Sequence, residues 1–459
     1  MKENNEHIHL PEGPEDIRIF QPSQWFFSKE VSSGILLLFA SLTAIIWANS
    51  TIAETYHHIL HADISISVGD YHLSRTFVHW INDGLMTLFF FTVGLEIKRE
   101  ILAGELSSPK LAMFPIIAAI GGMIVPGLIY MAFNHGTPYA GGWGIPVATD
   151  IAFSLGALAI FGKKVPFSLR IFLTAFAIAD DLGGVIIIAF FYTKGIIWKY
   201  LLISAVSVLV LALANMLWIR WIPFYVLMGF ITWLAMMGSG VHPTIAGVLV
   251  ALCTPVRSRY NIGRFVREVK SIMDNFRHNE EIGDYWYSIL MSHTPLRTVH
   301  SLASACRKVE TPLQRLEHIL HPWVAFLILP IFALANAGLT MEGMSLAEAA
   351  AHPVTLGIGL GLLVGKPVGV LLFSYLATKT GLASLPEGVR WSHIAGAAML
   401  GGIGFTISLF ISGLSFSSPE LLNYSKLGIL GGSALSGIAG ILFLTYDYIR
   451  DLKKWHWFS

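Results

Sequence analysis

Residues 171–192 read IFLTAFAIADDLGGVIIIAFFY, an apolar run broken by two adjacent acids, Asp180 and Asp181. The run is long enough to cross a bilayer as a helix, which takes about 20 residues. Each ionised side chain at the centre of such a helix costs roughly 2.5–3.5 kcal/mol on insertion scales. Carboxylates in this position usually face a cavity or a partner and mark an ion or proton path. A pair of helix-end acids at the membrane surface is the alternative, and apolar sequence on both sides argues against it.

The composition of the whole chain is typical of a membrane protein. Its 459 residues are 54% hydrophobic and only 13% charged, which is more apolar than a soluble core can absorb. The formal net charge of +1 predicts no nucleic-acid partner. Cys253 and Cys306, the two cysteines, form neither a disulfide framework nor a metal-ligand spacing. We therefore expect an all-α polytopic protein embedded in the lipid bilayer.

Apolar runs along the chain predict about twelve membrane spans. The least regular are the run at 77–97, which contains Asp83 and Glu96, and two short runs on either side of Gly238. The predicted spans lie near residues 30–48, 77–97, 111–133, 143–160, 167–192, 200–218, 221–237, 241–254, 322–339, 354–377, 393–413 and 425–447.

Lysine and arginine predict the orientation of these spans. An even number of spans places both termini on one side, and the segment 255–320 on that side carries about ten Lys and Arg. The opposite loops have none between Asn134 and Trp143 or between Thr340 and His352. Basic loops stay in the cytoplasm, so both termini should be cytoplasmic.

Five parts of the chain follow from the spans. The polar start has no basic segment leading into an apolar core, so we expect no cleaved signal peptide. The long internal loop predicts an amphipathic helix near 262–276, and its role stays open between regulation and a tolerated insertion. The parts are a polar cytoplasmic extension at 1–28, spans one to eight at 29–254, an enlarged cytoplasmic loop at 255–320, spans nine to twelve at 321–449 and a cytoplasmic tail at 450–459.

A different pattern occupies residues 64–73, ISISVGDYHL. Apolar and polar residues alternate around Gly69-Asp70, as in a two-residue β-hairpin with glycine at the first turn position. An isolated hairpin is marginal in water and its edges invite a partner strand. We expect an intermolecular contact here, and the alternative is a surface loop that alternates by chance.

Two further segments predict interrupted spans. Asp150 ends the sequence PVATD, and Pro146 with the glycines before it makes a poor helix start. Backbone left unpaired at mid-membrane is tolerated only where it lines a cavity or meets a polar group, which Thr149 and Asp150 can supply. Residues 401–406, GGIGFT, interrupt a second span. Paired interrupted spans in the two halves of a transporter indicate its substrate site.

Lys366 is the single basic residue of the run 354–377 and lies near its middle. A snorkelling lysine is the alternative, but both surfaces are far away, so we expect an acidic partner. Together with Asp150, Asp180 and Asp181 it would cost on the order of 10–14 kcal/mol if the groups were independent. They should therefore form one coupled site. Coupled carboxylates can hold protons and release them to bind a small hard cation, which is a sufficient mechanism for exchange.

The motifs in this chain resemble those of the NhaA family of bacterial sodium/proton antiporters, in the same order from about residue 25 to 450. This resemblance implies two interrupted helices among the twelve and inverted-topology repeats. The matching segments are NDGLM at 82–86, VGLEIKRE at 93–100, ATDIAF at 148–153, ADDLG at 179–183, LEHILHPW at 316–323, GKP at 365–367 and GIGF at 402–405.

The resemblance also implies roles for individual residues. Asp181 matches the principal sodium-binding carboxylate, Asp180 the neighbour that pairs with Lys366, and Asp150 and Thr149 the unwound-helix positions. The hairpin at 64–73 matches a homodimer contact. Positions associated with a pH response at a cytoplasmic funnel are Glu96, His242, Glu317, His318 and His321. His242 lies beside Gly240 and Pro243, so a capped turn is its alternative.

The activity implied is exchange of cytoplasmic Na+, or Li+, for external protons across the bacterial inner membrane. The resemblance further implies an electrogenic transporter that is active at alkaline pH, serves pH homeostasis, needs no cofactor and is not an enzyme. The loop at 255–320 and the extension at 1–28 are longer than is usual in the family.

Two other classes of protein remain as alternatives: a membrane enzyme of one of two kinds, and a sodium-coupled symporter. An intramembrane aspartyl enzyme would use acids on two helices, but Gly402-Ile403-Gly404 continues with Phe405 instead of the aspartate that such proteases carry. A prenyltransferase would want another acid three residues after Asp181, where Gly184 stands. A sodium-coupled solute symporter is the closer alternative, and it would need a roomier polar cavity.

Overall fold

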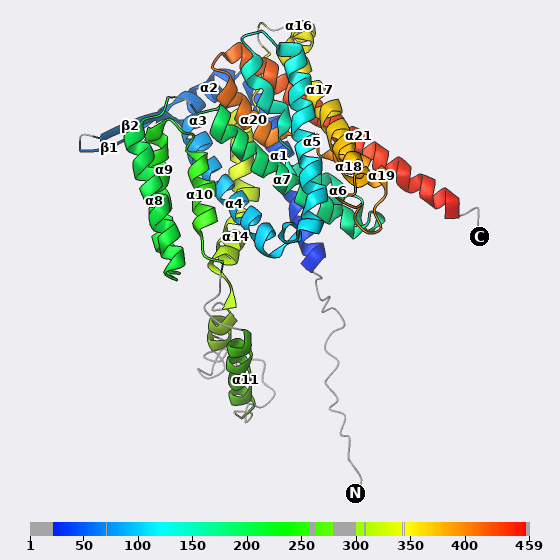
Figure 1. The fold of residues 1–459 in the computed structure, drawn as a ribbon. Coiled ribbons are helices and arrows are strands. Elements are labelled where there is room, and N and C mark those ends of the chain that lie inside the picture. Colours follow the sequence, from blue (N-terminus) through cyan, green and yellow to red (C-terminus); the bar gives the residue numbers. More distant parts are fainter. Residues whose placement is uncertain are drawn as a thin grey trace.

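The computed structural model describes residues 22–455 except 70, 194, 257–261, 279–299, 307, 308, 342 and 344. Most of this part of the chain is helical, and the helices form one bundle (Figure 1). The α-helices are α1 (Pro22–Ala48), α2 (Ala53–His61), α3 (Phe77–Trp80), α4 (Met86–Ala103), α5 (Pro109–Asn134), α6 (Ile151–Ala159), α7 (Phe167–Phe191), α8 (Trp198–Met216), α9 (Ile222–Ser239), α10 (Thr244–Cys253), α11 (Ile262–His278), α14 (Pro312–Trp323), α15 (Leu329–Asn336), α16 (Leu346–Ala351), α17 (Pro353–Leu360), α18 (Lys366–Lys379), α19 (Trp391–Leu400), α20 (Phe405–Ser415) and α21 (Pro419–Trp455).

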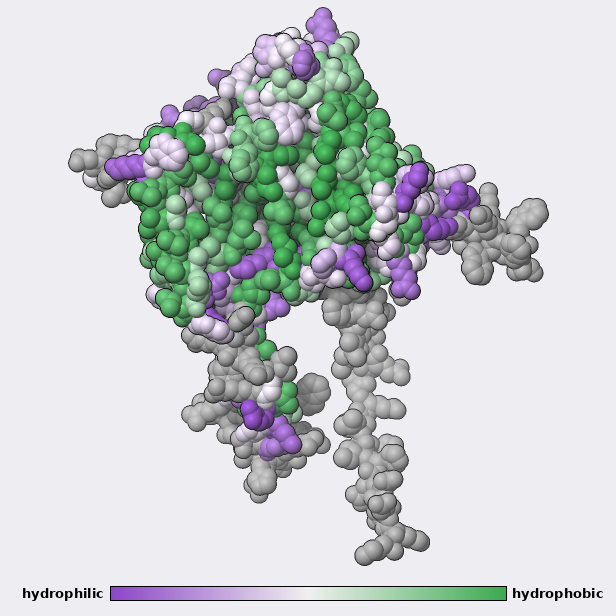
Figure 2. Space-filling view, in the orientation of Figure 1, coloured by the Kyte–Doolittle hydropathy of each residue, from purple (hydrophilic) through white to green (hydrophobic). Residues whose placement is uncertain are grey.

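The bundle is that of a polytopic membrane protein. Within the described residues, nine helices are long and apolar enough to cross a bilayer, or ten if α19 and α20 count as one bent span. Figure 2 shows a band of apolar side chains across the middle of the helices, with polar side chains gathered toward both ends. Such a band suits the hydrocarbon core of a membrane.

Two of the twelve predicted spans do not reach this standard. The run at 77–97 becomes α3, a π-helical turn η1 (Ile81–Leu85) and α4, which carries four charged residues between Glu96 and Glu100. The run at 241–254 becomes α10, which has only 10 residues. α4 and α10 pack side by side without room for a side chain at Gly94, where a Cβ would lie 2.7 Å from that of Ala251.

Two interruptions and a π-helical turn shape the rest of the bundle. The first interruption lies between α5 and α6. It consists of a 3₁₀ helix η3 (Ala140–Val147) and the non-helical residues 148–150. Between α19 and α20 the chain is non-helical at residues 401–404, and these two helices differ in direction by 47°. A π-helical turn η6 (Gly361–Gly365) leads directly into α18.

The predicted hairpin is present at one edge of the bundle. Strands β1 (Asp63–Val68) and β2 (Tyr71–Thr76) pair antiparallel, with Val68 opposite Tyr71. Gly69 has φ +60°, which the first turn position of a two-residue hairpin requires. The hairpin extends away from the helices beside α8 and α9 (Figure 1).

The predicted amphipathic helix near 262–276 is present as α11. It lies beyond the helix bundle, at the end opposite to α16 (Figure 1). We call these the α11 end and the α16 end of the molecule. The other residues of the long predicted loop that are placed include Pro312 and the start of α14, while 279–299 lies outside the described residues.

Candidate functional site

The two interruptions meet in the middle of the bundle and bond to each other. The backbone N–H of Asp150 donates to the carbonyl of Ile403 at 2.6 Å. The hydroxyl of Thr149 donates to the carbonyl of Gly401 at 2.8 Å, and that of Ser154 to the carbonyl of Leu400 at 2.8 Å. Each break therefore supplies partners for backbone groups of the other, where lipid offers none.

Asp150 lies between the starts of two helices. Its Oδ1 accepts the N–H of Phe153 in the first turn of α6 at 3.2 Å. Its Oδ2 accepts both the N–H and the hydroxyl of Thr406 in the first turn of α20, at 3.0 and 2.7 Å. Helix N-termini carry partial positive charge and favour a nearby carboxylate. Asp150 is 2% exposed, so this is a compensated buried charge.

Lys366 supplies the opposite charge at the end of η3. Its Nζ donates to the carbonyl of Val147 and to Oδ2 of Asp180, the latter at 2.7 Å. Both side chains are fully buried. The lysine follows the π-helical turn η6, and such turns recur at functional sites. A buried ion pair is weak evidence for stability, so its presence here indicates a use.

Asp181 lines a cavity, and like Asp180 it keeps one carboxylate oxygen without a hydrogen bond among the described residues. Among the described residues, no protein group hydrogen bonds to Oδ1 of Asp181 or to Oδ1 of Asp180. Asp181 is 2% exposed and lines a cavity of about 100 Å³ together with Asp150 and Thr406. A buried carboxylate oxygen left without a partner is costly, which favours a proton or a cation as its partner.

The cavity extends from this site toward the α11 end. Glu96 on α4 and His321 on α14 are among its lining residues. Beyond them, the guanidinium of Arg99 donates to Glu317 at 2.6 Å and to Glu100 at 3.0 Å. The structure thus brings Glu96, His321 and the Arg99–Glu317 pair to one region between α4 and α14.

The other two residues associated with a pH response lie elsewhere. His318 is exposed. His242 lies between α9 and α10, with Nδ1 2.8 Å from the hydroxyl of Thr244 and Nε2 3.7 Å from Asp83. Asp83 and Glu96 are 13 positions apart, roughly 20 Å along a helix. The structure therefore does not bring His242 to the cavity mouth, because α10 starts beside the other end of α4.

Thr406 and Ser154 are part of the site, although we predict no role for them from the sequence alone. Thr406 follows the glycine-rich break, and a hydroxyl beside a helix start is a common partner for buried groups. The position of Thr406 at a helix start was therefore a local sign of its role. Ser154 gave none, because its partner at Leu400 is 246 positions away.

Known proteins match nearly the whole chain. The model of the family described as Na+/H+ antiporter 1 matches residues 24–444. The antiporter NhaA of Oleidesulfovibrio alaskensis is 45% identical over 96% of this chain and 97% of its own length. NhaA 1 of Saccharophagus degradans is 45% identical over 93% of this chain and 92% of its own, and NhaA of Escherichia coli is 44% identical over 91% and 96%. A chain matched at this identity over this length belongs to the Na+/H+ antiporter 1 family, the NhaA antiporters.

Proposed function

We propose that this protein exchanges cytoplasmic Na+, or Li+, for external protons, and that protons and Na+ compete for Asp180 and Asp181. Family membership supports Na+/H+ exchange in general. The observation that carries the finer proposal is a pair of buried carboxylate oxygens, one on each aspartate, that have no hydrogen-bond partner among the described residues.

The chemistry follows from the donor set. Carboxylate and hydroxyl oxygens suit a small hard cation. When Asp181 and Asp180 are protonated, the buried site is nearly neutral. When Na+ enters, the carboxylates must ionise to bind it, and their protons leave by the same cavity. A proton and Na+ then cannot occupy the same oxygens together, and this exclusion couples the two flows.

Charge and pH dependence follow from the same competition. If both aspartates release a proton for each Na+, more protons than sodium ions cross, and transport is electrogenic. Protons at low pH fill the oxygens and exclude Na+, so activity should rise toward alkaline pH. Lys366 would hydrogen bond to Asp180 when Na+ is absent, and the pair would then hold, on the amine or on the carboxyl group, the proton that leaves when Na+ binds Asp180. Glu96, Glu317 and His321, grouped near the cavity mouth, are the residues we assign to the pH response, with His318 and His242 as more distant contributors.

The same proposal includes the arrangement in the membrane. We place the α11 end and both termini in the cytoplasm of a bacterium, with the protein in the inner membrane. We count twelve membrane spans. Ten are the nine long helices of the described residues and the bent α19–α20 pair, and the other two are the segment from α3 to α4 and the short helix α10. The interrupted spans are the one that contains α6 and the α19–α20 pair. We also propose that the protein has the inverted-topology repeats of the family and that the loop at 255–320 separates the first eight spans from the last four. We further propose that the protein forms a homodimer through the hairpin at 64–73.

The closest rival is a sodium-coupled solute symporter. Pockets that enclose small organic molecules measure roughly 300–1,000 Å³. The cavity beside Asp181 measures about 100 Å³, which has room for a small cation and a few water molecules. Its size favours an ion as the sole cargo.

The test is a fluorescent ΔpH assay in inside-out vesicles from a strain lacking its own sodium/proton antiporters. Respiration acidifies the vesicle interior, and Na+ is then added over a range of pH. We expect Na+ to collapse the gradient for the native chain and not for Asp181→Asn, because the amide holds no exchangeable charge. Glu348→Gln is the matched control, since this carboxylate is exposed at α16 and far from the cavity lining.

Immunoblots of the same vesicles establish that each variant is inserted. A native chain that leaves the gradient intact at every pH would refute the exchange proposal and favour solute symport. If Asp181→Asn collapses the gradient as well as the native chain does, protons and Na+ must compete for other residues.

A further inference from the structure

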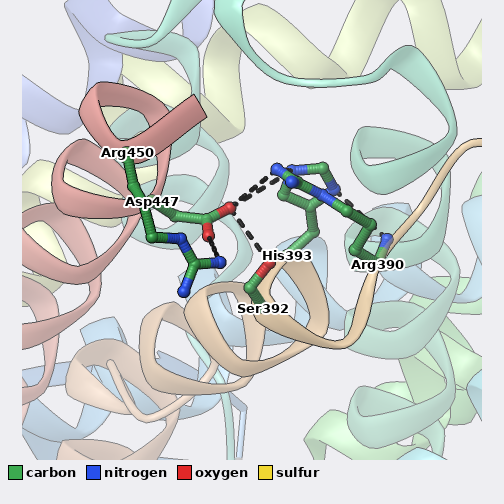
Figure 3. Close-up of polar contacts among 5 residues, drawn as sticks. All are labelled: Arg390, Ser392, His393, Asp447 and Arg450. Carbon is green, nitrogen blue, oxygen red and sulfur yellow. Dashed lines mark hydrogen bonds and ion pairs between the residues drawn. The ribbon is translucent and has the colours of Figure 1, made fainter. Parts of the chain in front are cut away.

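One buried carboxylate fastens the end of α21 to the start of α19 (Figure 3). The side chain of Asp447 is 4% exposed. Its Oδ2 accepts from the guanidinium of Arg390 at 2.9 Å and from the hydroxyl of Ser392 at 3.0 Å. Its Oδ1 accepts from the guanidinium of Arg450 at 2.9 Å. Nε2 of His393 lies 3.5 Å from Oδ2, so side chains of both helices converge on one acid.

The charges of this cluster suit its position. Asp447 is a carboxylate at the N-terminal end of α19, where the helix dipole favours negative charge. Hydrogen bonds between guanidinium and carboxylate groups are roughly twice as strong as neutral ones. Removing Asp447 would leave Arg390 and Arg450 facing each other across the helix contact. Asp447 therefore attaches the two helices strongly, and without its charge the two arginines would repel each other.

Glycines continue the attachment along the middle of the two helices. A Cβ at Gly396 of α19 would lie 2.3 Å from the side chain of Leu444. A Cβ at Gly440 of α21 would lie 2.7 Å from the side chain of Leu400 and 3.1 Å from its backbone nitrogen. The two helices are therefore in close contact along this stretch, and neither can shift without displacing a side chain of the other.

Serines complete the attachment at the far end of α19. The hydroxyl of Ser436 donates to the carbonyl of Met399 at 2.8 Å. Oγ of Ser433 accepts the N–H of Gly404 at 3.2 Å. Both serines belong to α21: Ser436 holds the last turn of α19, and Ser433 holds the break at 401–404. This break bonds through Gly401 and Ile403 to the segment of Asp150.

We propose that Asp447 is a positioning residue for ion binding, although it touches neither Na+ nor the aspartates of the site. It anchors α19 to α21 at the α11 end, and the ten-residue α19, about 15 Å long, carries that anchoring to the break. The break then holds Thr149 and Asp150 in register beside Asp181. The inference rests on the proposed Na+/H+ exchange, because its consequence is measured as Na+ affinity.

The test compares native chain and variants in the ΔpH assay, with the Na+ concentration for half-maximal exchange and the maximal rate measured separately. Asp447→Asn keeps the shape and an acceptor for Ser392 but removes the charge that holds the arginines. Residues coupled to a site through packed elements change its energetics by amounts worth roughly 2- to 30-fold. We expect the half-maximal Na+ concentration to rise within that range, with the maximal rate at saturating Na+ largely kept.

Three further variants make the result decisive. Asp447→Glu restores the charge and should recover part of the Na+ affinity. Glu387→Gln removes an exposed carboxylate three positions before Arg390 and should change nothing. If Asp447→Asn is absent from the membrane, Ser392→Ala carries the test, because it deletes one hydrogen bond and leaves every charge in place. It should raise the half-maximal concentration less than the loss of the charge would.

An unchanged half-maximal Na+ concentration in the variants, beside a working native chain, would overturn the positioning role. So would a fall in the maximal rate alone, which indicates loss of folded protein. A native chain without exchange would instead refute the proposed function, and the two failures are thereby distinguished.

Discussion

His352 lies outside the membrane-spanning segments, and its surroundings favour the neutral form of its imidazole. Burial lowers the pKa of its imidazole from the ordinary value of 6.5, and Glu420 opposes this shift. Nδ1 accepts the N–H of Val354 in the first turn of α17 at 3.3 Å, which a protonated ring nitrogen cannot do. The folded protein therefore binds this proton less readily than the unfolded chain does.

This depressed pKa predicts a pH dependence of stability. The contribution of His352 is complete above pH 6.5 and is lost as the pH falls toward the lower pKa of the folded state. We expect the thermal unfolding midpoint in detergent to drop between pH 7 and pH 5, and to drop less for His352→Gln, which does not titrate. Parallel pH curves for the two proteins would contradict the assignment.

Single residues were predictable where their chemistry is costly. Asp150, Asp180, Asp181 and Lys366 stand out because charge in an apolar run needs a reason, and the structure brings them together with Thr149. Asp447 did not stand out, because an acid near a basic membrane edge looks like ordinary surface charge. Its burial depends on Arg390, 57 positions away, and contact at that separation leaves no local pattern.

At the scale of elements, the crossing of α5 and α18 is the closest backbone approach that bears on the site. A Cβ at Gly121 would lie 2.3 Å from the carbonyl oxygen of Gly369, and one at Gly369 would lie 2.1 Å from that of Gly121. α18 begins at Lys366, so any separation of these helices moves the lysine. Spacing of glycines in sequence predicted neither partner, because many glycines in the chain face open space.

Gly121→Ala should therefore destabilise the protein by at least about 1–3 kcal/mol, the usual cost of overpacking, and weaken exchange. Gly431→Ala is the control, since a Cβ there meets nothing within 4 Å. Thermal midpoints and the ΔpH assay measure both variants. Equal midpoints for the two would mean that α5 and α18 can separate freely.

At the scale of the whole molecule, the hairpin extends from the bundle and contacts it at α3, where the indole of Trp80 donates to the carbonyl of Ile64 at 3.3 Å. In the part of the chain that the structure describes, its two strands pair only with each other, so their outer edges offer backbone groups to another chain. Its base is closed by the N–H of Phe77, which donates to the carbonyl of Ala62 at 2.9 Å. The hairpin can therefore be removed without pulling the bundle apart.

Replacing residues 63–76 with two glycines should convert a dimer to a monomer. Light scattering of the purified protein in detergent measures the mass, and the thermal midpoint reports whether the bundle is intact. A dimer that survives the deletion would place the contact between copies on another surface.

The mutual bonding of the two interruptions also has a consequence for biosynthesis. Residues 148–154 are made long before residues 400–406, yet the N–H of Asp150 and the hydroxyls of Thr149 and Ser154 bond to carbonyls of that later segment. Contacts so distant in sequence form late and slowly. The nascent first half must therefore wait with an unfinished helix in a medium that offers it no hydrogen bonds. We therefore expect a chain that stops before α20 to be degraded faster in the membrane than the full-length chain, because these groups stay without partners.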